Sequence, residues 1–178
     1  MKLRWLGLLL MCGLAGSAAR AQVGVYGKLD YVRYSEFGST STNYTGGGVG
    51  VYDDFLHIGP VNLGLDLRGD YARESKSNYR SLLGGVRVAV KVPLVGLRPY
   101  VQASVGVGGN RPKGPFAVGI TDISFNNKLT YEGFVGLDAR VLPFIDWRVI
   151  EVGGGSGSKL GSTSPTIFNV SSGLVLRF

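Results

Sequence analysis

A repeated alternation of apolar and polar residues, beginning at residue 22, constrains the fold of this chain more than any other feature. Successive side chains of a β-strand point to opposite faces, whereas an amphipathic helix repeats about every 3.6 residues. Six segments alternate clearly: 23–34, 62–71, 81–91, 97–107, 128–140 and 168–178. Glycine, at 29 of 178 residues, disfavours long helices, because each interior glycine costs a helix about 1 kcal/mol relative to alanine. The sequence predicts an all-β fold.

Two further segments, 49–58 and 145–152, have the length of strands but a less regular pattern. Asp53 and Asp54 interrupt the first, and Trp147 and Arg148 interrupt the second. A β-bulge, which inserts one extra residue into a strand, accounts for such an interruption. With these two segments the chain has eight predicted strands.

The predicted connections alternate in length along the chain. Residues 35–48, 72–80, 109–127 and 153–164 form long polar connections, and 59–61, 92–96 and 141–144 form short ones that each contain a proline. All long loops therefore emerge at one end of the strands. An antiparallel meander with an even number of strands gives this arrangement, and transmembrane barrels combine short turns at one end with long loops at the other. A soluble β-sandwich is the alternative fold, but it has no reason to alternate in this way.

The first 21 residues have the composition of a secretory signal peptide. Lys2 and Arg4 precede an apolar segment at 5–15, and Ala19 and Ala21 give the small-x-small spacing of a cleavage site. The apolar segment is shorter than the roughly 20 residues that span a bilayer as a helix. We therefore expect a signal peptide at 1–21 and a mature domain at 22–178. Cys12 lies inside the apolar segment, so we interpret it as part of that segment rather than as a lipid-attachment site.

The exported N-terminus, the alternation and the ending at residues 173–178 together resemble the small eight-stranded outer-membrane β-barrels of the OmpA/OmpX type. In that family a terminal aromatic residue preceded by alternating apolar residues acts as the signal for the barrel-assembly machinery. The resemblance implies that Leu174, Leu176 and Phe178 form this signal. It also implies an eight-stranded antiparallel up-and-down transmembrane β-barrel in the outer membrane of a diderm bacterium. Both termini would face the periplasm, with four loops outside and no periplasmic domain after Phe178.

The polar faces of the predicted strands carry charges of both signs, which would be very costly against lipid. An eight-stranded barrel has an interior just wide enough for side chains to fill. We therefore predict a network of ion pairs that plugs the lumen. Its predicted members are Lys28, Asp30, Asp66, Arg68, Arg87, Lys91, Arg98, Glu132, Asp138 and Arg140.

Few residues suggest catalysis or ligand chemistry. His57, the only histidine, lies beside the Gly59–Pro60 turn with no serine nearby, so we interpret it as structural. Asp53 and Asp54 are neighbours on a strand and point to opposite faces, unless a bulge realigns them. Glycine runs at 46–48 and 153–155 lack the lysine and helix of a phosphate-binding loop, so they predict surface loops. No metal-ligand spacing occurs in the sequence, and we expect neither a cofactor nor a metal.

Two surface features concern the membrane and possible partners. The aromatic residues Tyr31, Tyr71, Tyr131, Trp147 and Phe178 suit girdles at the two membrane interfaces. The predicted loops are net positive, which suits lipopolysaccharide phosphates or an anionic partner, although polar loops also occur simply because they face water. Charged loop residues considered for this contact are Arg73, Glu74, Lys76, Arg80, Arg111, Lys113 and Lys159.

These features predict a non-enzymatic, monomeric barrel with a structural, adhesive or envelope-integrity role. Its expected partners are outer-membrane lipid, lipopolysaccharide, the barrel-assembly machinery and an extracellular ligand at the loops. Nucleic acid is not expected, because the net charge of +7 falls to +4 without Lys2, Arg4 and Arg20. A lipid-modifying barrel enzyme that uses His57, a narrow pore and a carrier of small apolar ligands are the alternatives.

Overall fold

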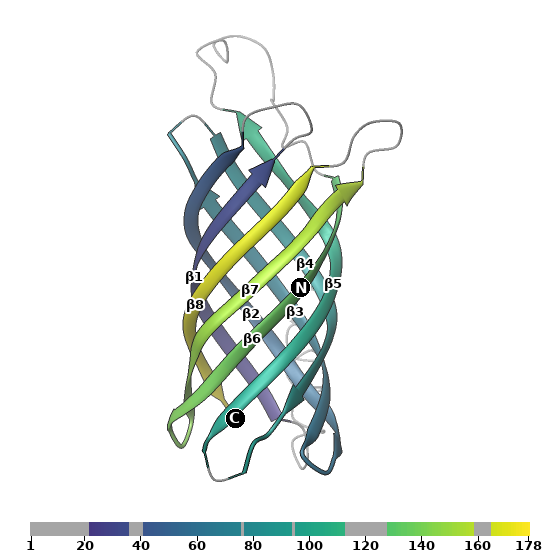
Figure 1. Cartoon of the computed structure of the whole chain (residues 1–178), viewed down its shortest axis with the longest axis vertical. Helices are drawn as coiled ribbons and strands as arrows, with labels where there is room; N and C mark the ends of the chain where they lie inside the picture. The colour runs from purple at the N-terminus through teal and green to yellow at the C-terminus, as the bar shows by residue number, and fades with distance from the viewer. Residues whose placement is uncertain (1–21, 36–40, 76, 94, 113–127, 159–164) are drawn as a thin grey trace, which may run out of the picture.

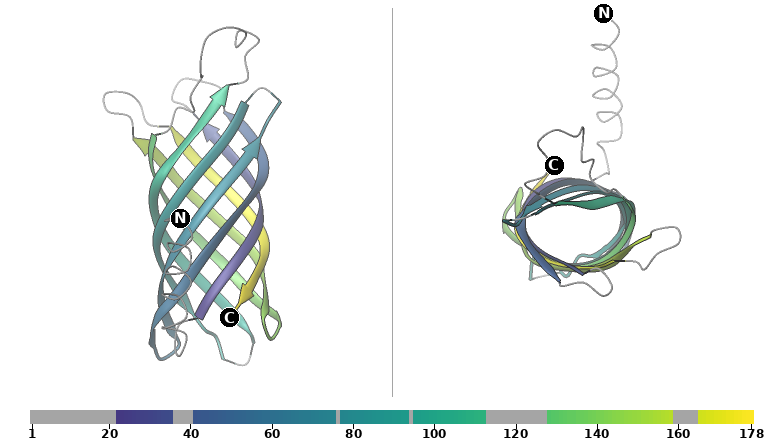
Figure 2. Two further views of the ribbon diagram at one scale, coloured as in Figure 1. Left: turned by 180° about the vertical axis from the view of Figure 1, so that it is seen from behind. Right: turned by 90° about the horizontal axis from the view of Figure 1, so that it is seen from above.

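The alternation of the sequence becomes the two faces of one closed sheet. The computed structural model describes residues 22–35, 41–75, 77–93, 95–112, 128–158 and 165–178. Eight antiparallel strands follow one another in chain order, and β1 pairs with both β2 and β8, so the sheet closes into a barrel (Figure 1). Seen along its axis, the wall forms a continuous ring (Figure 2). The predicted eight-stranded antiparallel barrel is confirmed.

The strands are longer than the alternating segments alone suggested. Their bounds are β1 Gln22–Ser35, β2 Thr42–Ile58, β3 Val61–Arg73, β4 Ser77–Val90, β5 Leu97–Pro112, β6 Lys128–Leu142, β7 Ile145–Ser158 and β8 Thr166–Arg177. Most of the added residues lie toward the end that carries the predicted long loops.

Three short connections lie at the lower end of the barrel in Figure 1, where β8 also ends. Gly59 and Pro60 join β2 to β3, residues 91–96 join β4 to β5, and residues 143–144 join β6 to β7. Gly59 and Gly96 have φ angles of +58° and +65°, a backbone conformation that strongly favours glycine. The prediction of short turns at these three places is confirmed.

The connection between β3 and β4 is also short, and here the predicted long loop at 72–80 is wrong. Only residues 74–76 separate the two strands, and the backbone N–H of Glu74 donates to the carbonyl oxygen of Ser77 at 2.9 Å. The polar composition of 72–80 reflects strand ends that extend beyond the apolar part of the wall.

Both glycine runs lie in strands, which corrects the prediction that they form loops. Residues 46–48 pair with β1 and β3, and residues 153–155 pair with β6 and β8. Large interior side chains require the absence of a Cβ at Gly48 and Gly153. A Cβ on Gly48 would lie 2.0 Å from Asp70 Oδ1, and one on Gly153 would lie 2.3 Å from Asn169 Oδ1.

The two bulges allowed by the sequence are present. The β2–β3 pairing shifts between Asp54 and Leu56, and the β7–β8 pairing shifts between Arg148 and Glu151. The β6–β7 pairing has two further shifts, after Leu137 and after Arg140. The facing changes in the strand that carries the extra residue, and in β7 this brings both Arg148 and Glu151 inside.

Apolar side chains cover the outside of the barrel, and charged, polar and tyrosine side chains fill most of the inside, together with a few apolar ones such as Leu83 and Val175. This is the reverse of a soluble domain, in which the core is apolar. Exposed apolar residues include Val25, Leu29, Val49, Leu65, Leu67, Leu82, Val86, Val101, Val105, Val135 and Leu174. No helix among the described residues is long and apolar enough to cross a membrane.

Candidate functional site

The interior of the barrel holds buried charges in equal numbers of each sign among the described residues. Its buried cations are Lys28, Arg68, Arg87, Arg98, Lys128, Arg148 and Arg177. Its buried anions are Asp30, Asp54, Asp66, Glu132, Asp138, Asp146 and Glu151. An unpaired buried charge costs several kcal/mol, so this balance allows so many charges to lie inside one wall.

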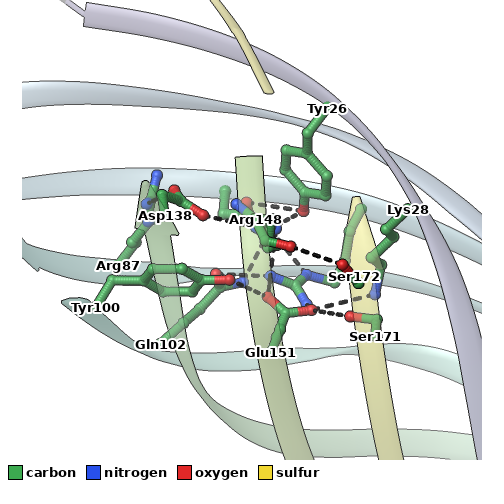
Figure 3. A network of polar contacts seen from close by, with 12 residues as sticks. Tyr26, Lys28, Arg87, Tyr100, Gln102, Asp138, Arg148, Glu151, Ser171 and Ser172 are labelled. Carbon is green, nitrogen blue, oxygen red and sulfur yellow. Dashed lines mark hydrogen bonds and ion pairs between the residues drawn. The ribbon is translucent and has the colours of Figure 1, made fainter. Parts of the chain in front are cut away.

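Glu151 is the centre of the network (Figure 3). Its carboxylate faces three cations, with Lys28 Nζ at 3.3 Å, Arg68 Nη1 at 2.9 Å and Arg148 Nη1 at 3.3 Å. The hydroxyl of Tyr100 donates to it at 2.6 Å, and that of Ser171 donates at 3.2 Å. These contacts join β1, β3, β5, β7 and β8 across the lumen.

Asp138 is a second acceptor, nearer the short-turn end. It accepts hydrogen bonds from Arg87 Nη2 at 2.8 Å and Arg148 Nε at 3.1 Å, and Arg177 Nη2 lies 3.6 Å away. Arg148 therefore contacts both Asp138 and Glu151 and joins the two halves of the network. Arg177 also pairs with Asp146.

Asp66 is the second carboxylate that pairs with the guanidinium of Arg68, in addition to Glu151. Its carboxylate accepts from Arg68 Nε at 3.0 Å, from the Tyr26 hydroxyl at 2.9 Å and from Gln102 Nε2 at 2.8 Å. The side-chain oxygen of Gln102 accepts in turn from Arg68 Nη2 at 2.8 Å. The guanidinium of Arg68 thus contacts two carboxylates and an amide.

Aromatic rings separate the guanidinium groups. Arg87 lies 3.9 Å from the ring centroid of Tyr52 and 4.2 Å from that of Tyr100. Arg148 lies 4.9 Å from the Tyr100 ring and 4.1 Å from the Tyr26 ring. Stacking of this kind stabilises a desolvated cation by about 2 kcal/mol. The result is a column of alternating rings and guanidinium groups through the lumen.

A cluster of tyrosines fills the loop end of the lumen. Tyr34 and Tyr44 each lie about 6 Å from Tyr79, at 6.1 and 6.0 Å between ring centroids. The hydroxyl of Ser77 donates to that of Tyr44 at 2.8 Å, and Lys128 Nζ donates to that of Tyr34 at 3.4 Å. We call Tyr34, Tyr44 and Tyr79 the tyrosine cluster. It lies above the charge network, so the lumen is filled at two levels.

Eight of the ten residues predicted for the lumen network are buried inside the barrel. They are Lys28, Asp30, Asp66, Arg68, Arg87, Arg98, Glu132 and Asp138. Lys91 and Arg140 are exposed, which corrects the prediction for these two. Lys91 lies just after β4 ends, and Arg140 lies near the end of β6, where the last residues of the strand are exposed, so both lie beyond the enclosed part of the lumen.

Four important members of the network were not predicted from the sequence: Asp146, Arg148, Glu151 and Arg177. Arg148 and Glu151 are three residues apart, and alternation would place them on opposite faces. The bulge between them places both inside. Arg177 lies between the outward-facing Leu176 and Phe178, so the rule that selected the other charged residues of the polar faces would have included it.

The remaining candidates lie apart from the network. His57 is exposed beside the Gly59–Pro60 turn. Asp54 is buried, whereas Asp53 is half-buried and pairs with the outward-facing Leu65, so the two carboxylates do not converge. Among the described residues, no group of three or more histidine, cysteine or acidic side chains has the arrangement of a metal site.

Other predictions fall partly or wholly outside the described residues. The expected signal peptide, with Ala19 and Ala21 of its cleavage site, lies outside the described residues. Lys76, Lys113, Lys159 and the side chain of Arg111 also lie outside them. At the C-terminus, Leu174, Leu176 and Phe178 all face outward.

Exposed aromatic side chains lie near both ends of the wall. Tyr31, Tyr71 and Tyr131 lie toward the loop ends of β1, β3 and β6, as does Phe168 on β8. Phe55, Phe144, Trp147 and Phe178 lie toward the short-turn end. Phe55, Phe144 and Phe168 were not among the predicted girdle residues. The apolar wall lies between these two aromatic belts.

Solved structures with the same fold share little sequence with this chain. The surface protein NspA of Neisseria superposes with a TM-score of 0.67 at 14% identity, over 88% of this chain and 97% of that one. The attachment invasion locus protein Ail of Yersinia pestis gives 0.61 at 13% identity, over 89% and 99%. The chain has the fold of small outer-membrane β-barrels. The outer-membrane enzyme PagL shares this transmembrane fold, with a TM-score of 0.51 at 11% identity, over 82% and 97% of the two chains. No family model and no curated protein sequence matches the chain.

Proposed function

We propose that this chain is an integral outer-membrane barrel that has no catalytic role and presents its loops at the cell surface for structural or adhesive contacts. The observation that carries this proposal is the filled lumen. The Glu151 and Asp138 networks and the tyrosine cluster occupy the interior at two levels, so the side chains of the described residues leave little open space in the lumen. What remains for interaction is the outside of the molecule.

The names of two structures with this fold support a surface role. NspA is described as a surface protein and Ail as an attachment invasion locus protein. Both are similar to this chain in fold alone, so they support the class of function and not a particular ligand.

PagL shows that the same fold also supports an enzyme. For this chain, histidine-based catalysis would depend on His57, which is exposed at the short-turn end. We propose that His57 is not catalytic. Lipid analysis of cells that express the wild type or His57→Ala should give identical envelope lipids, and a lipid product that only the wild type forms would favour the enzyme.

Expression of the full chain, residues 1–178, in a diderm bacterium tests the proposed location. The protein should fractionate with the outer membrane, and its gel mobility should shift on boiling, as expected of a stable barrel. The mass of the mature protein, measured by mass spectrometry, should correspond to a chain that begins at Gln22. An epitope inserted within 113–127 should be accessible on intact cells, whereas one inserted at 143–144 should be accessible only after lysis. Recovery in the soluble periplasm, or the reverse epitope accessibility, would contradict the proposal.

A further inference from the structure

A groove crosses the outer wall of β1, β2 and β3. Three glycines, Gly27, Gly47 and Gly69, lie on the outward face of these neighbouring strands and form its floor. Its volume is about 520 Å³, and a Cβ added at Gly27 would meet nothing within 4 Å. Val49, Tyr71 and Arg80 also line this groove.

The groove continues toward the short-turn end. A second depression of about 760 Å³ shares Gly27 and Val49 with the first and reaches Trp147 and Leu174. Tyr71 belongs to the aromatic belt at the loop end, and Trp147 belongs to the belt at the short-turn end. The combined groove therefore runs obliquely across the strands from β3 to β7, between the two belts.

Arginines gather at the loop end of this groove. The guanidinium of Arg73 lies 5.0 Å from the ring centroid of Tyr71, and Arg80 is the cross-strand partner of Tyr71. Arg33 is exposed near the same end of β1. The acidic side chain in the connecting turn is Glu74, so the charge at this edge is net positive. Guanidinium groups form strong, often bidentate hydrogen bonds with phosphate.

We propose that this groove binds a phosphorylated glycolipid of the lipid A type. One acyl chain would lie over Gly27, Gly47 and Gly69, and a phosphate would contact Arg73 and Arg80 beside Tyr71. The choice of lipid A rests on the proposed location, because it requires the loop end to lie in the outer leaflet. Glycines make this side of the wall concave, and the arginines provide a charge opposite to that of the phosphate.

Native mass spectrometry of the purified barrel in detergent, mixed with bis-phosphorylated lipid A, tests this site. The double variant Arg73→Gln/Arg80→Gln should bind at least about tenfold more weakly, since a hydrogen bond to a charged group contributes about 1.5–3 kcal/mol and 1.4 kcal/mol is tenfold. Gly69→Leu should also weaken binding, by filling the groove. Its new Cβ would meet only Leu82 Cδ1 and Ser81 O, both at 3.8 Å, so the barrel itself should be unaffected.

Gly133→Leu is the matched control for the groove. Gly133 lies on β6, across the barrel from β2 in strand order, and its Cβ would meet only Gln102 O at 3.9 Å. Arg140→Gln, an exposed arginine at the short-turn end, is the control for charge. Both controls should bind lipid A as the wild type does.

Three results would overturn the proposal. One is lipid A binding by the site variants that equals that of the wild type, or a loss of lipid A binding in the control variants as large as in the site variants. Another is equal binding of dephosphorylated lipid A or phosphatidylglycerol. The third is a dimer that Gly69→Leu abolishes, which would show that a second copy of the chain occupies the groove. Boiling-dependent gel mobility of the same preparations shows whether the barrel is intact, and cell fractionation reports its location, so failure of the site and failure of the proposed function are distinguishable.

Discussion

Arg148 and Glu151 lie on one strand, three residues apart, and their side chains form an ion pair of 3.3 Å inside the barrel. In a regular strand, residues three apart point to opposite faces. The bulge in β7 removes this conflict, because the two residues Val149 and Ile150 lie between the pairs that flank the single residue Ser172, so β7 carries one extra residue. One local irregularity thus brings the bridging cation to the central anion of the lumen.

Neutralising the central anion should destabilise the barrel strongly. In Glu151→Gln, three buried cations lose their shared carboxylate, and removal of one partner from a buried ion pair costs about 3–5 kcal/mol. Denaturant unfolding in detergent should show this loss in the free energy of unfolding. Arg140→Gln changes an exposed charge and should stay within about 0.5 kcal/mol of the wild type. Equal stability of the two variants would mean that the network contributes little.

Adjacent glycines in β7 should differ sharply in their tolerance of alanine. A Cβ at Gly153 would lie 2.3 Å from Asn169 Oδ1 and 2.5 Å from Phe134 Cδ1, whereas one at Gly154 would meet only Ile167 O at 3.8 Å. Overpacking an interior costs about 1–3 kcal/mol, so Gly153→Ala should unfold at lower denaturant concentration and Gly154→Ala should not. The same unfolding midpoint for both variants would contradict the inward packing at Gly153.

The wild-type barrel should show no steady conductance in planar bilayers, because its lumen is filled at two levels. Tyr79→Ala opens only the tyrosine cluster and should remain closed. The double variant Tyr79→Ala/Arg148→Ala removes side chains from both levels and should show brief openings. A large and stable wild-type conductance would mean that the side chains do not block the lumen.

Removal of the last residue should prevent assembly. The side chain of Phe178 is 77% exposed at the short-turn end, and its backbone N–H donates to Val23 O at 2.9 Å, next to the start of the barrel. The variant lacking Phe178 should be degraded or remain in the periplasm, whereas Phe178→Tyr keeps an aromatic ring and should assemble normally. Both outcomes are measured by outer-membrane fractionation. Normal assembly of the truncated chain would exclude Phe178 as the assembly signal.

The fold could be predicted from the sequence because a membrane barrel follows one simple rule over its whole length. A residue such as Leu65 must face lipid and its neighbour Asp66 must not, so the alternation determines both the strands and their facing. The order of the strands then follows from short turns such as Gly59–Pro60. Strand ends were less predictable. Glycines such as those at 46–48 and 153–155 are common in loops, but they also occur in strands where large neighbouring side chains leave no room for a Cβ.

The interior network could be predicted only in part, and its errors have local causes. Alternation placed Arg68 and Asp138 correctly on the polar face. It does not state which cation meets which anion, since partners such as Lys28 and Glu151 are 123 residues apart in the chain. It also fails across the bulge of β7, and for this reason Arg148 and Glu151 were missed together, whereas Arg140 was misplaced because it lies at the exposed end of β6.

The length of the strands also affects what lies outside the membrane. A tilted strand needs only about 9–11 residues to cross a bilayer, whereas β2 has 17 and β5 has 16. At about 3.4 Å per residue and a tilt near 45°, the surplus extends on the order of 10 Å past the loop-side aromatic belt. The upper part of the barrel therefore continues as paired strands beyond the apolar wall. These strand ends would hold the loops, and any molecule bound to them, above the lipid headgroups. Shortening the strand ends would bring the loops closer to the membrane without changing a loop residue.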